Sequence, residues 1–185
     1  MDELVQQAMA KWPQVPDCYG WLALDRRGNW FLRDEAVQAT GSKGSRLEHA
    51  KLIAFIGRNY APDASGRWFF QNGPQRVFVE LETAPFVWRI ARSAQAAGEP
   101  PIFALTAHTG TGARMRRCWV DEAGWLYLET DIGFGLVHSL DMESAADAIG
   151  QGLWVPQEVA ANALETRFGF VRSPQQLQQR QLQRP

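Results

Sequence analysis

The stretch GWLALDRRGNWFLRD, residues 20–34, places the phrase Asp-x-x-Gly between two arms rich in Leu, Trp and Phe. Asp25 suits the first position of a type I turn, because its carboxylate accepts hydrogen bonds from backbone N–H groups. Gly28 suits the left-handed position that closes such a loop. Apolar and aromatic arms of this kind are typical of half-buried strands. The stretch therefore predicts a β-hairpin.

The same phrase returns twice, in DASGRWFF at residues 63–70 and in DEAGWLYLE at residues 121–129. A Trp stands two residues after the Gly in the first two phrases, but immediately after it in the third. A shift of one residue turns a side chain to the other face of its strand. A repeated ligand site should keep its register, whereas a repeated turn need not. We therefore interpret the phrase as a recurring turn and not as a recurring functional site.

Strand and helix patterns together predict an α+β fold. The segment RVFVELE, residues 76–82, alternates with period two after the turn signal Asn72-Gly73, as expected for a strand. A helix is expected from Ser45 to Arg58, begun by a capping box of Ser45 and Glu48. Two more helices are expected after Asp141, the second with Pro156 at its first position.

The expected architecture is one or two sheets built from antiparallel hairpins, with three to four helices packed on them. Residues 1–172 are predicted to form a single domain, the alternative being two related halves at residues 17–95 and 101–172. The halves are suggested because each has strands around an Asp-x-x-Gly hairpin and at least one helix. Residues 173–185 are Gln-rich and are predicted to form a partly disordered tail.

Composition narrows the class of protein. The 185 residues are 45% hydrophobic and 21% charged, which is typical of a globular chain. A net charge of −1 creates no overall field to attract nucleic acid or an anionic membrane. Cys18 and Cys118 form no metal-ligand spacing, and the acidic N-terminus is unlike a signal peptide. We therefore expect a cytoplasmic protein with no membrane partner and no cofactor, and the charge balance argues against nucleic acid as a partner.

The segment HTGTGARMRR, residues 108–117, is the first candidate site. Its glycines allow close backbone approach, and His108, Thr109, Thr111, Arg114 and Arg116 offer groups that hold a phosphate or carboxylate. It is not a P-loop, because the ending GK[ST] is absent. The alternative is a hairpin loop followed by a strand, 114–117, whose arginines form a solvated face.

His138 is the second candidate, since Glu129, Asp131 and Asp141 are near it in sequence. A histidine and carboxylates that come together in the fold can form a metal site or a general acid–base pair. However, no HxH, HxxE or HExxH spacing occurs, and the alternative is a half-buried imidazole with its hydrogen bonds satisfied. The sequence indicates no metal site and no catalytic set, and so favours a non-enzymatic protein.

Eight tryptophans are many for this length, and they serve either the core or an exposed binding face. The first hypothesis is a cytosolic, non-enzymatic interaction module that self-associates, as a homodimer or larger homo-oligomer. The second is a protein or enzyme that binds a small anionic ligand with His108, His138 and the 114–117 strand. The third is single-stranded nucleic-acid binding by stacking on exposed rings.

The segment GRWFFQNGPQRVFVELETAPFVWRI, residues 66–90, and the overall length resemble small bacterial proteins of conserved families of unknown function. The resemblance implies no activity, cofactor or site residue.

Overall fold

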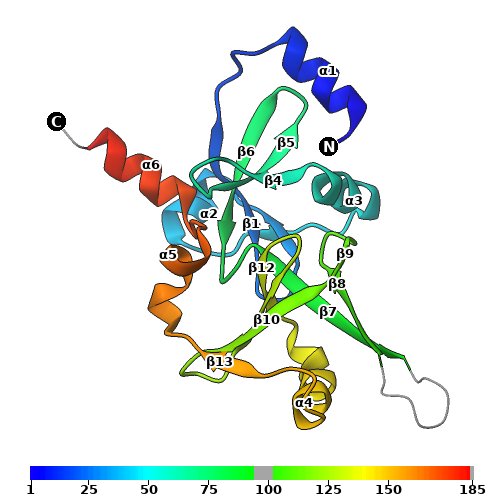
Figure 1. The fold of residues 1–185 in the computed structure, drawn as a ribbon. Coiled ribbons are helices and arrows are strands. Elements are labelled where there is room, and N and C mark those ends of the chain that lie inside the picture. The colour runs from blue at the N-terminus through cyan, green and yellow to red at the C-terminus, as the bar shows by residue number, and fades with distance from the viewer. Residues whose placement is uncertain (94–101, 184–185) are drawn as a thin grey trace. The chain divides into compact units, whose positions relative to one another are not determined.

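The computed structural model describes residues 1–93 and 102–183 (Figure 1). The chain groups into two compact units, each with its own sheet. Unit 1 contains Met1–Asp25, Asn29–Thr83 and Gly169–Pro185, and unit 2 contains Arg26–Gly28 and Ala84–Phe168. The single domain over residues 1–172 and its two related halves remain predictions. The boundary predicted between the halves, at residues 96–100, lies outside the described residues.

Unit 1 is a six-stranded sheet with four helices. Its strands are β1 (Cys18–Leu24), β2 (Trp30–Leu32), β3 (Ser45–Arg46), β4 (Tyr60–Pro62), β5 (Trp68–Asn72) and β6 (Gln75–Leu81), in the order β3-β2-β1-β6-β5-β4. Its helices are α1 (Glu3–Lys11), α2 (Glu35–Thr40), α3 (Ala50–Arg58) and α6 (Pro174–Leu182). All pairs in this sheet are antiparallel except β1 with β6, which run parallel.

Aromatic rings form much of the core of unit 1 on the sheet face that α3 covers. Phe55 of α3 meets Phe70 of β5 edge to face, with ring centroids 5.4 Å apart. Trp30 meets Tyr60 at 5.3 Å, and Tyr60 lies 4.7 Å from Trp68. Such pairs favour edge-to-face and tilted geometry because of the ring quadrupoles. Much of the unusual aromatic content of the sequence is therefore explained by packing.

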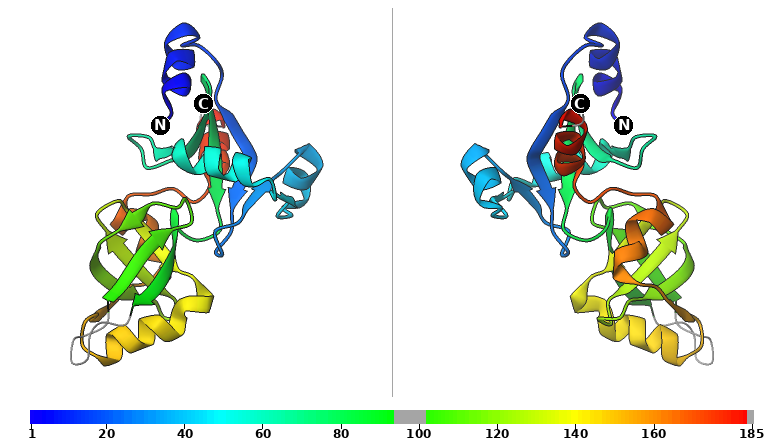
Figure 2. Two further views of the ribbon diagram at one scale, coloured as in Figure 1. Left: turned by 90° about the vertical axis from the view of Figure 1, so that its right-hand side faces the viewer. Right: turned by 90° about the vertical axis from the view of Figure 1, so that its left-hand side faces the viewer.

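Helix α6 packs on β6 and β1 and is held by a half-buried glutamate, Glu80 (Figures 1 and 2). The Ser173 hydroxyl and the Gln175 N–H both donate to the Glu80 carboxylate, the latter at 3.0 Å. Ser173 is also the N-cap, its side chain accepting from the Gln176 N–H. Val77 of β6 pairs with Phe70, which α3 contacts, so Val77 marks the sheet face that α3 covers. Glu80 is three residues from Val77, and side chains an odd number of residues apart point to opposite faces of a strand, so α6 lies on the other face.

Unit 2 has a seven-stranded sheet. Its strands are β7 (Phe86–Ser93), β8 (Ile102–Ala107), β9 (Gly112–Ala113), β10 (Met115–Val120), β11 (Leu126–Thr130), β12 (Phe134–Val137) and β13 (Pro156–Glu158), in the order β13-β10-β11-β12-β7-β8-β9. Its helices are α4 (Met142–Gly150) and α5 (Leu164–Phe168), with 3-10 turns at Ser139–Asp141 and Ala161–Ala163. The pairs β12–β7 and β10–β13 are parallel, and the others are antiparallel.

A stack of rings joins α5 to the unit 2 sheet. Phe168 lies parallel to Phe134 with centroids 3.7 Å apart, and Phe134 in turn stacks on Tyr127 at 5.5 Å. Trp119 meets Phe168 edge to face, and the Arg167 guanidinium lies 4.0 Å from the Trp119 ring centroid. The short helix α5 is thus fixed by aromatic and cation–π contacts.

The three Asp-x-x-Gly phrases form the same turn, as predicted. In the third, the Asp121 Oδ1 atom accepts from the N–H groups of Ala123 and Trp125, and the Asp121 N–H donates to the Trp125 carbonyl. Asp63 binds Ser65 and Arg67 in the corresponding way.

Asp25 binds the Asn29 N–H, completing the set. The glycines that close the turns, Gly28, Gly66 and Gly124, have φ angles of 78°, 77° and 79°. The left-handed conformation is therefore occupied by Gly in each turn, where it carries no Cβ penalty. The phrase encodes a piece of architecture.

Two expectations about the fold are corrected. The sheets are mixed and not purely antiparallel, because three strand pairs run parallel. The described residues contain six α-helices, more than the three to four expected. The extra helices are the short α2, whose six residues are too few to show a periodic pattern, and α6, which lies in the segment predicted to be a partly disordered tail.

Two element boundaries also differ from the expectation. Ser45 lies in β3, and α3 begins at Ala50 with His49 as its N-cap, whose Nδ1 accepts from the Leu52 N–H at 3.2 Å. Pro156 begins strand β13 and not a helix. In both places pairing with a distant strand replaces the helix that the local signal favoured.

Candidate functional site

The predicted residues 108–111 form the tight turn between β8 and β9. The Thr109 and Thr111 hydroxyls lie 3.3 Å apart, and the Ala107 N–H donates to the Thr111 carbonyl at 2.8 Å. The half-buried His108 imidazole accepts from the Val87 N–H through Nδ1 at 3.3 Å. His108 therefore helps to connect this turn to the start of β7.

His138 follows β12, on the other side of β7 in the strand order. The backbone N–H of His138 donates to the Trp88 carbonyl, and the buried imidazole of His138 accepts from the Leu140 N–H through Nδ1 at 3.1 Å. His138 thus caps the 3-10 turn before α4. His108 and His138 therefore approach β7 from opposite edges of that strand: His108 Nδ1 accepts from a backbone N–H of β7 itself, and His138 Nδ1 accepts from a backbone N–H of its own turn.

Asp141, at the end of that 3-10 turn, connects α4 to β7. Its carboxylate accepts from Arg89 at 2.6 and 3.1 Å and from the Ile90 N–H at 3.0 Å. Burial would raise the pKa of Asp141, but the Arg89 guanidinium and the Ile90 N–H outweigh it and lower that pKa. The arrangement is a bidentate ion pair that positions a helix.

The predicted arginines are Arg114, immediately before β10, and Arg116 and Arg117 within it. The Arg114 N–H donates to the Asp131 carboxylate at 2.8 Å, and the Asp131 N–H donates back to the Arg114 carbonyl. Arg116 and Arg117 are exposed, and the register of β10 with β11 shifts between Met115 and Arg117. The structure therefore places Thr109 and Thr111 together, and the exposed arginines on a different strand.

Beside β10 lies β13, which is at one end of the strand order. The two strands run parallel, with Cys118 opposite Pro156 and Val120 opposite Glu158. Trp154 is buried, with its ring 6.0 Å from that of Phe103, and the next residue, Val155, is 73% exposed. We call Arg116, Arg117, Val155 and Glu158 the β13 edge.

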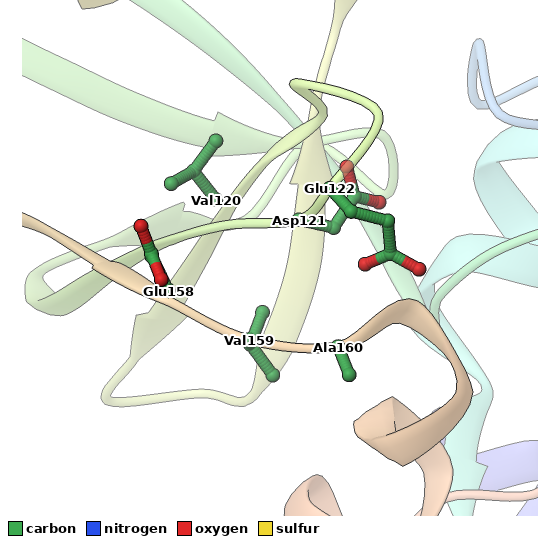
Figure 3. A pocket seen from close by; sticks show the side chains of 6 residues that line it. All are labelled: Val120, Asp121, Glu122, Glu158, Val159 and Ala160. Atoms are coloured by element: carbon green, nitrogen blue, oxygen red, sulfur yellow. The ribbon is translucent and has the colours of Figure 1, made fainter.

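An open pocket of about 510 Å³ lies at the far end of the same strands (Figure 3). It is lined by residues 120–122 of the turn after β10 and by residues 158–160. The Glu122 carboxylate accepts from the Ala161 N–H at 2.9 Å, and that of Asp121 accepts from the Tyr127 hydroxyl at 2.9 Å. Together with Glu158 these side chains make the pocket acidic, so the basic and acidic groups occupy opposite ends of β10 and β13.

Three properties of the described residues bear on function, namely metal binding, membrane spanning and thiol reactivity. No group of three or more His, Cys, Asp and Glu side chains among them is placed to hold a metal ion. None of the helices seen in residues 1–93 and 102–183 is long and apolar enough to span a bilayer. Burial raises the pKa of the Cys118 thiol to about 11, so this thiol resists forming the reactive thiolate.

Most tryptophans belong to the two cores. Five are buried, namely Trp30, Trp68, Trp88, Trp119 and Trp154. Trp125 is half-buried and precedes β11, whereas Trp12 and Trp21 are 52% and 43% exposed. Packing in the two cores therefore accounts for five of the eight tryptophan rings.

The reading of the sequence missed Val155 and Glu158 because it placed the segment from residue 156 in a helix. A usable signal is the apolar run Leu153-Trp154-Val155 before Pro156, which is typical of a chain entering a strand at a sheet edge. No local signal indicates that this strand pairs with β10, nearly forty residues earlier.

The fold defines a mixed α+β protein with two sheets. A family model described as "Protein of unknown function (DUF2946)" matches residues 1–175, and the chain belongs to that family. The resemblance to a conserved family of unknown function is thus confirmed. A comparison with curated proteins finds no match.

Two solved structures match this chain. A DUF1285 family protein from Silicibacter pomeroyi DSS-3 is 16% identical, with a TM-score of 0.51 over 80% of this chain and 84% of that chain. A second DUF1285 family protein, from Shewanella baltica OS155, is also 16% identical, with a TM-score of 0.47 over 69% of this chain and 91% of that chain. The first likeness shows a shared fold.

Proposed function

We propose that this protein is a non-enzymatic binding module that self-associates, and that the β13 edge of one copy contacts the β13 edge of another. The observation that carries the proposal is the exposure of Val155, whose apolar side chain is 73% exposed. It lies beside the β10–β13 strand pair, which is basic at one end and acidic at the other. Exposed apolar groups rimmed by charge are typical of interaction sites.

The contact is proposed to involve side chains and not the strand backbone. Pro156 has no N–H to donate, β13 has three residues, and Glu158 adds a charge. These are the features by which proteins prevent the addition of a further strand at a sheet edge. Val155 and its charged neighbours are then the groups left to form an interface.

The charge distribution favours a second copy as the partner. Arg116 and Arg117 lie at the start of β10, whereas Glu122 and Glu158 lie at the end of the β10–β13 pair. A two-fold axis perpendicular to these strands opposes the basic end of one copy to the acidic end of the other. The same surface is thus complementary to itself in charge.

The test is sedimentation equilibrium of wild type, Glu158→Arg, Arg117→Glu and the double variant. We expect a wild-type dimer, a dissociation constant raised by about tenfold or more in each single variant, and recovery in the double variant, because it restores opposite charges. Val155→Asp should weaken the dimer in the same way. Higher salt should weaken the wild-type dimer, since exposed charges are screened.

Glu48→Arg is the matched control, because Glu48 is an exposed glutamate of unit 1. Far-UV circular dichroism checks that each variant is folded. A protein that stays monomeric at all concentrations would refute self-association. A dimer that none of these variants weakens would place the interface elsewhere and refute the β13 edge.

A further inference from the structure

A second pocket, of about 170 Å³, lies entirely within unit 1. Its walls come from the end of β1, from β2, from residues 41–43 after α2, and from the end of β6. The volume is well below that of pockets for drug-sized ligands, and so suits a molecule of a few heavy atoms. Phe31 and Ala23 supply apolar surface between charged side chains.

Both signs of charge line this pocket. Arg33 and Lys43 provide a guanidinium and an ammonium group, and three lining residues provide carboxylates, namely Asp25, Glu80 and Glu82. Lys43 Nζ lies 3.0 Å from a Glu82 carboxylate oxygen, with the lysine side chain 60% exposed. Arg33 Nε donates to the Ser42 carbonyl at 3.4 Å, which leaves its other donors for a ligand.

Glu80 has acceptor capacity left in the pocket. Each of its oxygens accepts one hydrogen bond, from the Ser173 hydroxyl or the Gln175 N–H, whereas an ionised carboxylate offers about four lone-pair positions. Burial raises the pKa of Glu80, and the positive charge of Arg33 is among the effects that offset this rise. An ammonium group beside Glu80 would further favour its ionised form.

We propose that this pocket binds a small zwitterion of the amino-acid class, with its carboxylate toward Arg33 and Lys43 and its ammonium group toward Glu80. Separate groups of both signs around a small apolar surface match a molecule that carries both charges a few bonds apart. A simple anion would meet Glu80 and Glu82, and a simple cation would meet Arg33 and Lys43.

The test is titration of the ¹⁵N-labelled protein with L-alanine, followed by amide chemical shifts of residues 41–43. We expect saturable shifts with a dissociation constant on the order of 1 mM, and binding at least about tenfold weaker for acetate and for methylammonium, each of which matches half of the site. Lys43→Gln and Arg33→Gln should each weaken alanine binding by about tenfold.

Lys51→Gln is the control, because Lys51 is an exposed lysine of α3 outside the pocket. Lys43 is well exposed, so its replacement tests binding without disturbing the fold. The proposal is overturned if alanine produces no saturable shift up to about 20 mM, far above the expected constant. It is also overturned if acetate binds as well as alanine, or if Lys51→Gln weakens binding as much as Lys43→Gln.

Discussion

Gly66 and Gly124 close identical turns in different surroundings. Both have φ angles near +78°, which residues with a Cβ rarely adopt. A Cβ atom at Gly66 would lie 2.2 Å from the Gly169 carbonyl oxygen, whereas one at Gly124 would have nothing within 4 Å. The two positions therefore separate backbone strain from steric overlap with a neighbouring segment.

We predict that Gly66→Ala destabilises the protein more than Gly124→Ala. Gly124→Ala should lower the free energy of unfolding by about 1–2 kcal/mol, which is the cost of placing an alanine in the left-handed conformation. The first adds the cost of moving a backbone segment, because the overlapping atom is a carbonyl oxygen. Urea unfolding of both variants measures the difference. Equal losses of stability would contradict the prediction, because they would mean that the backbone of residues 169–170 moves aside at no measurable energetic cost.

Helix α6 illustrates how a single carboxylate organises an element. Glu80 receives the N-cap side chain and a backbone N–H of the helix, and Gln175 reaches Gln38 of α2 at 2.7 Å. The helix has few apolar residues of its own, so these polar contacts fix its start. The state of Glu80 should therefore influence both the docking of α6 and the stability of unit 1.

We predict a pH dependence that depends on Glu80. Burial raises its folded-state pKa above the ordinary value of 4.5, so the native state holds the proton to higher pH than the unfolded chain. The contribution of Glu80 to stability is therefore fully present below pH 4.5 and is lost as pH rises through the folded pKa. Relative to Glu80→Gln, wild type should be more stable at pH 4 than at pH 7.

Denaturant unfolding at several pH values measures this difference between wild type and Glu80→Gln. Ser173→Ala is the companion variant, which removes the N-cap and one hydrogen bond to Glu80 and should cost about 1 kcal/mol. Parallel stability profiles for wild type and Glu80→Gln would contradict the role assigned to Glu80.

At the scale of elements, the sequence predicted the turns and strands whose structure depends on residues close in the chain. The Asp25, Asp63 and Asp121 turns were predictable because each carboxylate binds N–H groups within four residues. The alternation in residues 76–82 likewise indicated β6, which the structure contains at Gln75–Leu81.

Elements that depend on distant partners were not predictable in the same way. The capping-box pattern at Ser45 favoured a helix, yet Ser45 pairs with Leu32 in the sheet. Leu22 pairs with Val79 in parallel, across more than fifty residues. The residues Arg33 and Glu80 line the same pocket only because β1 pairs with β6, so no motif in either segment predicts the site.

At the scale of the whole molecule, the protein has two hydrophobic cores, one in each unit. Unit 1 is packed by rings around Tyr60, and unit 2 by the stack around Phe134. Val79 and Leu128 are 0% exposed, one in each core. Local opening of a protein often follows such compact units.

We predict that Leu128→Ala costs about 2–5 kcal/mol, because it leaves a cavity in a close-packed core. Hydrogen exchange should speed up in β10–β12 while β5 and β6 keep most of their protection, and Val79→Ala should give the reverse pattern. Mass spectrometry of peptic peptides reads both units at once. Equal acceleration in both units for either variant would show that they open as one.

Unit 1 is not continuous in the chain, and this has a consequence for synthesis. The segment from Gly169 onward supplies α6 and the bridge between Val171 and Arg67, yet it follows all of residues 84–168. On the ribosome, nearly all of unit 2 has therefore emerged before unit 1 can complete its sheet covering. Until then α6 does not cover the Glu80 face of β6, so this face of unit 1 stays exposed in the nascent chain.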